Sequence, residues 1–322
     1  MPSPSLDANY KPSWPVRLIS SLALLIDPEI YEQRQIIKVR TFWRAFPDLS
    51  NSLSYHRGMA IVVDGKLAVP LYHGTNELFY ESIKEHGFGG RDIIKELHVV
   101  EVLRELLTIC KECLSAHVED RWFGWMTSAD FIARQNVTAS GANFRHGSVY
   151  LTAADYKAMS HATAYETGSE ILECFMMISK RLNEHQIELP ESILRRSKPI
   201  LEFASGGKCP LLFVLNDVPI SILAAENGGD ANSVFAGPAS MLSEDPNFFG
   251  VLCQALNFEL LQPMPISEIK VFRMVKDYSS EQDQYSVVPY EPPHVSGANG
   301  TATDGRRWVR DNGWGYGKWV EF

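Results

Sequence analysis

The chain has 322 residues, of which 45% are hydrophobic, and its formal net charge at pH 7 is -9. A length of this order fits two small domains or one elaborated domain, and the apolar share is sufficient for a buried core. The acidic balance argues against a general nucleic-acid coat, which is normally basic, although it leaves room for a local basic patch.

The cysteine content indicates neither a disulfide framework nor a zinc site. The chain is large and has an odd number of cysteines, five, so a disulfide-stapled fold is not expected. Cys110 and Cys113 form a lone Cys-x-x-Cys within a helical pattern, with no second Cys/His pair at zinc-finger spacing. We therefore expect buried core cysteines and no metal.

The N-terminal region reads as an arm followed by a helix. Residues 1–16 are rich in Pro, Ser and Asn, and residues 18–43 fit a helix broken at Asp27-Pro28. The apolar run at residues 18–26 is too short to span a bilayer, and its flanks lack a cleavage pattern. These features predict a cytoplasmic protein without a membrane partner.

Strands and helices then alternate irregularly along the chain. Residues 56–75 predict a hairpin, with a strand at 59–63, a turn at Asp64-Gly65 and a return strand at 67–72. The other expected helices cover 76–86 (stopped by Gly87), 91–118, 153–165 and 169–185; the other expected strands cover 149–152, 210–215 and 266–274. Residues 122–144 are mixed, 225–247 predict a loop, 248–261 a helix or strand, and the chain from Asp277 onward a polar tail. The whole pattern predicts an α+β fold.

Three short segments carry residues typical of one active site. They are residues 71–75 (Leu-Tyr-His-Gly-Thr), 148–152 (Ser-Val-Tyr-Leu-Thr) and 257–259 (Asn-Phe-Glu). Taken singly, His73 favours a core histidine, Tyr150 favours core packing and Glu259 favours a solvated edge position. Their order, and the helix expected after each of the first two, favours a shared functional site.

In these motifs the chain resembles the diphtheria-toxin-like and poly(ADP-ribose)-polymerase-like ADP-ribosyltransferases, whose signature is a His, a Tyr and a Glu on three strands. The resemblance covers roughly residues 66–275. It implies a split mixed β-sheet core with flanking helices. It also implies that NAD+ is the substrate and that a domain at 56–276 is catalytic, between an N-terminal extension (1–55) and a Trp/Arg/Gly-rich tail (277–322).

The resemblance implies a role for each motif residue. His73 and Thr75 would contact ribose hydroxyls, and the Gly74 backbone would clamp the nicotinamide amide. Tyr150 would stack on the nicotinamide ring, and Glu259 would bond the ribose 2'-hydroxyl and stabilise the cationic transition state.

Two assignments stay open within this scheme. Tyr165, with Tyr156 behind it, is the candidate for a second aromatic ring that closes the nicotinamide slot. Glu268 and Glu170 compete with Glu259 as the catalytic carboxylate.

Several functions are compatible with this core. The resemblance favours a mono-ADP-ribosyltransferase toxin of a toxin–antitoxin or phage-defence system, held silent by an antitoxin or chaperone. The alternating basic and aromatic residues of 305–319 lean toward a nucleic-acid acceptor, because such segments stack bases and pair phosphates. The alternatives are an effector that modifies a host protein, an inactive NAD-binding or interaction module, and, ranked lower, an enzyme that removes a 2'-phosphate from RNA.

Overall fold

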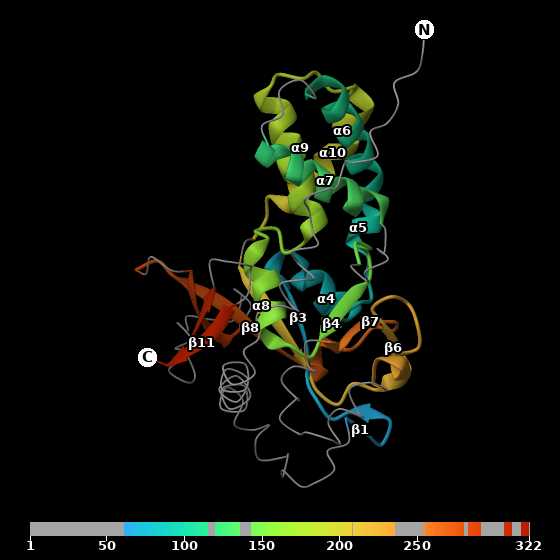
Figure 1. The fold of residues 1–322 in the computed structure, drawn as a ribbon, viewed down its shortest axis with the longest axis vertical. Coiled ribbons are helices and arrows are strands. Elements are labelled where there is room, and N and C mark those ends of the chain that lie inside the picture. Colours follow the sequence, from blue (N-terminus) through green and yellow to red (C-terminus); the bar gives the residue numbers. More distant parts are fainter. Residues whose placement is uncertain are drawn as a thin grey trace, which may run out of the picture.

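The computed structural model describes residues 61–114, 120–135, 143–207, 209–235, 253, 255–279, 283–290, 306–310 and 317–321. The expected N-terminal arm and helix lie outside these residues. Figure 1 shows a helical layer standing on one side of a large sheet, which is the arrangement of an α+β protein.

The sheet has nine strands within the described residues, in the order β11-β10-β9-β8-β5-β3-β4-β7-β6. Their bounds are β3 (Leu71–Asn76), β4 (Val149–Thr152), β5 (Pro210–Leu215), β6 (Leu223–Ala225), β7 (Asn257–Leu260), β8 (Ile269–Asp277), β9 (Gln284–Pro289), β10 (Arg306–Arg310) and β11 (Gly317–Glu321). Every described ladder is antiparallel, so the expectation of a mixed sheet is wrong. The helical insertion after β3 returns the chain to the end of the sheet where β3 finishes, and β4 therefore runs back against it.

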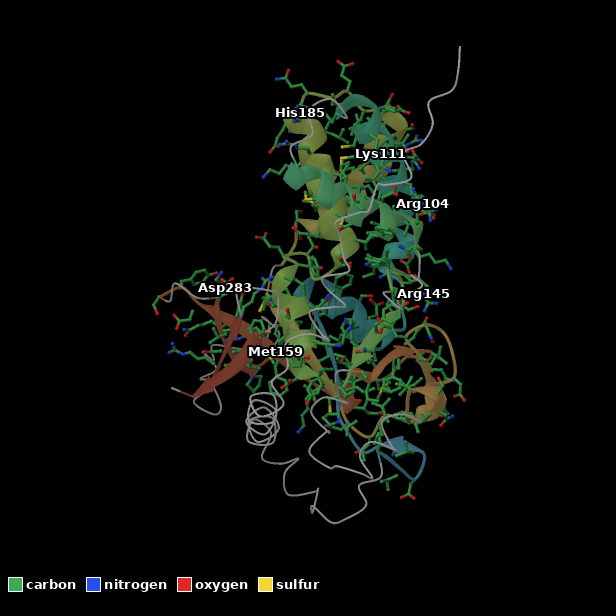
Figure 2. The ribbon with its side chains drawn as sticks, in the orientation of Figure 1. Arg104, Lys111, Arg145, Met159, His185 and Asp283 are labelled. Carbon is green, nitrogen blue, oxygen red and sulfur yellow. The ribbon has the colours of Figure 1, made fainter. Side chains whose placement is uncertain are left out.

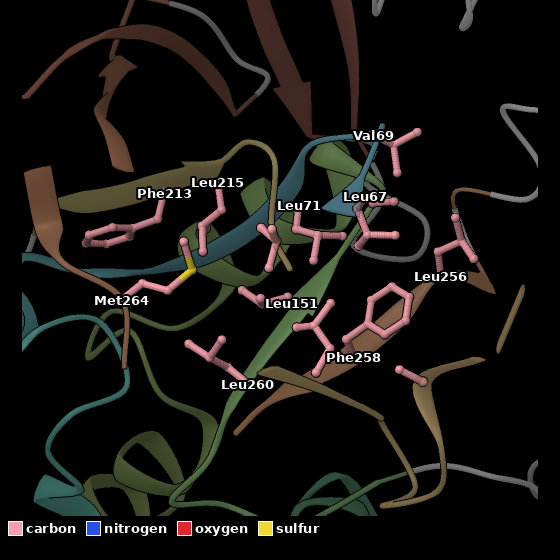
Figure 3. Packing of buried hydrophobic residues seen from close by; sticks show 14 of the residues in the cluster. Leu67, Val69, Leu71, Leu151, Phe213, Leu215, Leu256, Phe258, Leu260 and Met264 are labelled. Atoms are coloured by element: carbon pink, nitrogen blue, oxygen red, sulfur yellow. The ribbon is translucent and has the colours of Figure 1, made fainter. Parts of the chain in front are cut away.

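Alternating side chains give the sheet two apolar faces. On β5, Leu211, Phe213 and Leu215 join one core, and Leu212 and Val214 join the core on the opposite face. Figure 3 shows the first core, to which neighbouring strands contribute Leu71, Leu151, Phe258 and Leu260. The opposite face is covered by α8 (Asp155–Ala164), which packs across β3 and β5.

The helical layer has its own core. It contains α6 (Val99–Leu114), α7 (Asp120–Arg134), α9 (Glu170–Glu184) and α10 (Glu191–Ala204), and it stands above the sheet in Figure 1. The buried residues of α6 recur at helical spacing, and they pack against α9 and α7. Between β3 and this layer lie a 3-10 turn (Glu77–Phe79), α4 (Tyr80–His86) and α5 (Ile93–Glu96).

Most expected elements are present, with corrected bounds. Asp64 and Gly65 form the hairpin turn, with φ of 50° and 74°, between β1 (Val62–Val63) and β2 (Lys66–Leu67). The single return strand expected at 67–72 is wrong, because the chain breaks before Pro70 and starts β3 anew. The helix expected at 91–118 is divided into α5 and α6 at His98, whose φ is 53°.

Other elements differ from expectation in kind. Helix α7 occupies much of the stretch read as mixed, and α10 was not expected. In the expected loop 225–247, β6 supplies the first residue and residues 231–235 are helical, while 236–247 lie outside the described residues. Of the element expected at 248–261, residues 257–260 form β7.

The chain after Asp277 is part of the sheet. We expected the last clear strand at 266–274 and then a polar tail, but β9, β10 and β11 follow β8 and extend the sheet at one edge. Trp308 on β10 is fully buried against Tyr285 and the α8-side core, so this segment is held by packing.

All five cysteines are free. Each helix in the described part of the chain is too short or too polar to cross a membrane.

Candidate functional site

The sheet opens between β3 and β4. Strand β3 pairs with β5 along its full length, from Leu71 to Asn76, but it pairs with β4 at a single position, Tyr72 opposite Thr152. Beyond that pair the two strands diverge. A cleft of about 470 Å³ occupies the gap, within the size range of small-molecule sites.

The cleft lies where the helical layer meets the sheet. Its walls come from β3, β4, α8, the 143–148 loop and the start of α9. Arg145, which lines the cleft, is labelled in Figure 2 between the helices above and the sheet below. The cleft therefore combines apolar walls with polar side chains from elements far apart in the sequence.

His73 bridges the opening in the sheet. Its Nδ1 lies 2.8 Å from the backbone oxygen of Tyr150, and its ring packs edge-on against Phe88 at 5.4 Å. Because a carbonyl oxygen only accepts, Nδ1 carries the hydrogen and Nε2 remains as an acceptor. Burial lowers the pKa of His73, and the bond to Tyr150 only partly offsets this effect, so the ring is neutral near pH 7.

Gly74 and Thr75 follow His73 along the cleft wall. A side chain at Gly74 would overlap the backbone oxygen of Ala158 on α8, so only glycine permits the close approach of this helix to β3. The Thr75 hydroxyl donates its hydrogen to the backbone oxygen of Gly168 at 3.0 Å. The Thr75 oxygen can therefore only accept a hydrogen bond from a ligand.

Tyr150 and Glu259 are direct neighbours on adjacent strands. They face each other across the β4–β7 ladder, and neither belongs to the apolar core on the opposite face of the sheet. The Tyr150 hydroxyl is buried without a hydrogen-bond partner of normal geometry, although Asn143 and Ser148 lie near it. Burial raises the pKa of this hydroxyl, and the Asn143 side chain offsets part of the effect.

Both carboxylate oxygens of Glu259 are held. Ser148 Oγ donates to Oε1 at 2.7 Å, and Arg145 reaches Oε2 at 3.3 Å. Arg145 also donates to the backbone oxygen of Glu226 at 2.7 Å and to the Asn143 side chain at 3.2 Å. The Glu259 side chain is 15% exposed. Glu259 does not line the cleft itself, but Ser148 and Arg145, which fix the orientation of its carboxylate, do.

Helix α8 presents Lys157 and His161, one turn apart, to the cleft. Burial lowers the pKa of Lys157, and nearby Glu226 partly offsets this. His161 is the aromatic ring that α8 contributes to the cleft wall. Burial, with smaller contributions from His73 and His146, lowers its pKa to about 3.

Tyr165 does not line the cleft. It is the C-cap residue of α8, with extended backbone, and its ring packs edge-on against His161 at 4.9 Å. Its hydroxyl donates to Glu170 at 3.2 Å. Tyr156 packs against the α8-side core. The ring that we expected from Tyr165 is therefore supplied to the cleft by His161.

Glu170 and His146 form a polar pair in the same cleft. His146 Nε2 lies 3.9 Å from a Glu170 oxygen, and its Nδ1 donates to the Phe144 oxygen at 2.9 Å. Burial lowers the pKa of His146 to about 4 and raises that of Glu170.

The three candidates for the catalytic carboxylate differ in their position relative to the cleft. Glu268 is exposed on a 3-10 turn (Ile266–Glu268) and does not line the cleft, whereas Glu170 does. Glu259 does not line the cleft either, but it faces Tyr150, the predicted stacking ring, across the β4–β7 ladder. Sequence reasoning missed Arg145, His146 and His161 because helical spacing or loop position alone does not reveal which residues converge on a cleft.

The described residues include no group of three or more His, Cys, Asp or Glu side chains placed to hold a metal ion. Comparisons of the chain with protein-family models, with curated proteins and with solved structures found no match.

Proposed function

We propose that the chain is an NAD+-dependent ADP-ribosyltransferase with an ADP-ribosyltransferase-like fold. The observation that carries the proposal is the meeting of three adjacent strands at one opening in the sheet, where His73 and Tyr150 line the cleft and Glu259 faces Tyr150. Glu259 does not line the cleft itself, but it bonds Ser148 and Arg145, which do. Each has the chemistry that the reaction needs at its position.

The reaction breaks the bond between nicotinamide and C1' of its ribose, with oxocarbenium character in the transition state. In the proposed complex Tyr150 stacks on the nicotinamide ring, and His161 closes the slot from α8. The Glu259 carboxylate accepts a hydrogen bond from the ribose 2'-hydroxyl and stabilises the positive charge that develops on the sugar. The acceptor nucleophile then attacks C1' and loses its proton, and nicotinamide leaves as a neutral molecule.

Ser148 and Arg145 orient the catalytic carboxylate. Ser148 holds one oxygen, and this contact is compatible with a substrate hydroxyl on the carboxylate's remaining lone pairs. Arg145 lies 3.3 Å from the other oxygen and offsets the charge of the carboxylate, which holds it in the orientation that the ribose needs.

The acceptor is a macromolecule. The basic and aromatic C-terminal segment favours nucleic acid on sequence grounds, but Trp308 is buried and Arg307 bonds Asp277, so these two side chains serve the fold. A protein acceptor is the alternative. The toxin role, with an antitoxin or chaperone as partner, follows from the resemblance and is part of the proposal.

The test is label transfer from tagged NAD+ in a cell lysate, with Glu259→Gln as the control, followed by separate protease and nuclease digestion. Label that protease removes identifies a protein acceptor, and label that nuclease removes identifies a nucleic acid. If neither the wild type nor Glu259→Gln transfers label, and neither releases nicotinamide, the transferase is refuted and the inactive binding module is favoured. Expression of the two forms tests the toxin role, since only the wild type should arrest growth.

A further inference from the structure

One end of the cleft gathers hydrogen-bond acceptors. His73 and His146 each donate a hydrogen bond from Nδ1 to a backbone oxygen, so the Nε2 atom of each ring is an acceptor. The Glu170 carboxylate lies 3.9 Å from His146 Nε2 and accepts from Tyr165 at 3.2 Å. Such a set binds a group rich in donors, such as a sugar diol.

Each cation that lines the described cleft has an acidic partner or neighbour other than Glu170. Arg91 bonds Glu96 through several hydrogen bonds, and Arg145 bonds Glu259. Lys157 is the third, and the Glu226 carboxylate raises its pKa against the effect of burial. A phosphate at the Glu170 end would therefore meet a carboxylate without a compensating cation from this set.

The Glu170 end adjoins the residues that the proposed function gives to ribose. Thr75 bonds the backbone oxygen of Gly168, and a side chain at Gly168 would overlap Asn76, so the 168–170 segment is packed directly against the end of β3. His73, Ser169 and Glu170 line the same cleft. The ribose that contacts His73 and Thr75 would thus have Glu170 beside it.

We infer that Glu170, held by the Tyr165 hydroxyl, is a specificity residue that accepts the free 2'-hydroxyl of the adenosine ribose and excludes a phosphate there. The inference rests on the proposed function, because it assigns one part of NAD+ to one end of the cleft. Carboxylates select an unmodified ribose in this way in other dinucleotide sites, where a cation is needed to take the 2'-phosphate.

Among the acceptors at this end of the cleft Glu170 is the carboxylate, so it is the strongest source of repulsion toward a phosphate there. It is the first residue of α9, a helix of 15 residues, and the Ser169 side chain makes no capping bond. The N-terminus of a helix attracts phosphate. Replacing the carboxylate by an amide keeps the hydrogen bonding and the size while removing the repulsion.

The experiment measures binding of NAD+ and NADP+ to the full chain by calorimetry. Wild type should bind NAD+ at least about a hundredfold more tightly than NADP+. Glu170→Gln should reduce this ratio at least about tenfold, and Glu170→Asp should retain most of it. The matched control is Glu173→Gln, which removes the same charge from the same helix turn at a residue that does not line the cleft.

The outcomes separate the two proposals. Similar affinities of wild type for NAD+ and NADP+, or equal ratios in folded Glu170→Gln and wild type, would overturn the role of Glu170 while leaving the transferase in place. A wild-type protein that binds neither nucleotide would overturn both. The ratio of NAD+ to NADP+ affinity is measured on the wild type alone, so the inference remains testable even if Glu170→Gln fails to fold.

Discussion

The neutral histidines of the cleft make the stability of the protein sensitive to acid. Burial lowers the pKa of His161 to about 3 and that of His146 to about 4. A histidine in the unfolded chain has a pKa of about 6.5. Below that pH the histidine is protonated in the unfolded chain but stays neutral in the folded protein. Each buried histidine therefore contributes nothing at pH 7.5 and favours unfolding progressively as the pH falls toward its folded pKa.

The magnitude follows from the interval between the two pKa values. At pH 5 an unfolded histidine lies about 1.5 pH units below its pKa, while His161 in the native protein is still neutral, so it costs about 2 kcal/mol of unfolding free energy. The perturbation is His161→Gln, which keeps a polar side chain and removes the titration. Between pH 7.5 and pH 5, wild type should lose about 2 kcal/mol more stability than the variant.

Urea denaturation of both proteins at the two pH values measures this double difference. The matched control is His185→Gln, which changes an exposed histidine at the far end of α9 (Figure 2). A stability gap between wild type and His161→Gln that is the same at both pH values would refute the reasoning, because it would mean that His161 is freely protonated in the folded state.

Two further substitutions test how the cleft and the sheet are built. Gly74→Ala should lower the free energy of unfolding by about 1–3 kcal/mol in thermal or urea melts, because its methyl group would overlap the Ala158 backbone oxygen and push α8 off β3. Gly229→Ala, in an exposed turn, is the control, and equal stability of the two variants would contradict the packing argument. Trp308→Ala should cost about 3–5 kcal/mol because the side chain is fully buried. An unchanged melting temperature with loss of nucleic-acid binding would instead make Trp308 a contact residue.

Two strands and one helix end could be predicted from the sequence because local patterns define them. Residues 149–152 and 210–215 form strands with the expected bounds, and the helix before Gly87 ends where expected. Apolar β-formers next to turn residues are sufficient for such elements. His73, Tyr150 and Glu259 were singled out by the resemblance of their motifs, and the structure places each of them on a strand.

The residues that complete the cleft depend on long-range geometry. Arg145 meets Glu259 across 114 positions of the chain, through the packing of the 143–148 loop, and no local pattern predicts that contact. Tyr165 was expected in the cleft from its place near a helix end. It leaves the helix in extended conformation, so His161, one turn earlier, faces the cleft instead.

The C-terminal strands were missed for a different reason. The chain after Asp277 is polar and rich in Gly and Pro, which is typical of a tail. Its strands lie toward one edge of the sheet, where pairing with β8 and burial of a few side chains such as Trp308 hold them. That stabilisation comes from partners along the sheet and leaves little hydrophobic pattern in the segment itself.

The most direct test of the transferase compares purified wild type with Glu259→Gln for NAD+ binding by calorimetry and for nicotinamide release by chromatography. We expect the variant to bind NAD+ with a Kd within about threefold of wild type, because Tyr150, His73 and His161 still form the slot, and to release nicotinamide at least about a hundredfold more slowly. Equal rates of nicotinamide release from the two proteins would contradict the account, and so would a wild-type protein that does not bind NAD+.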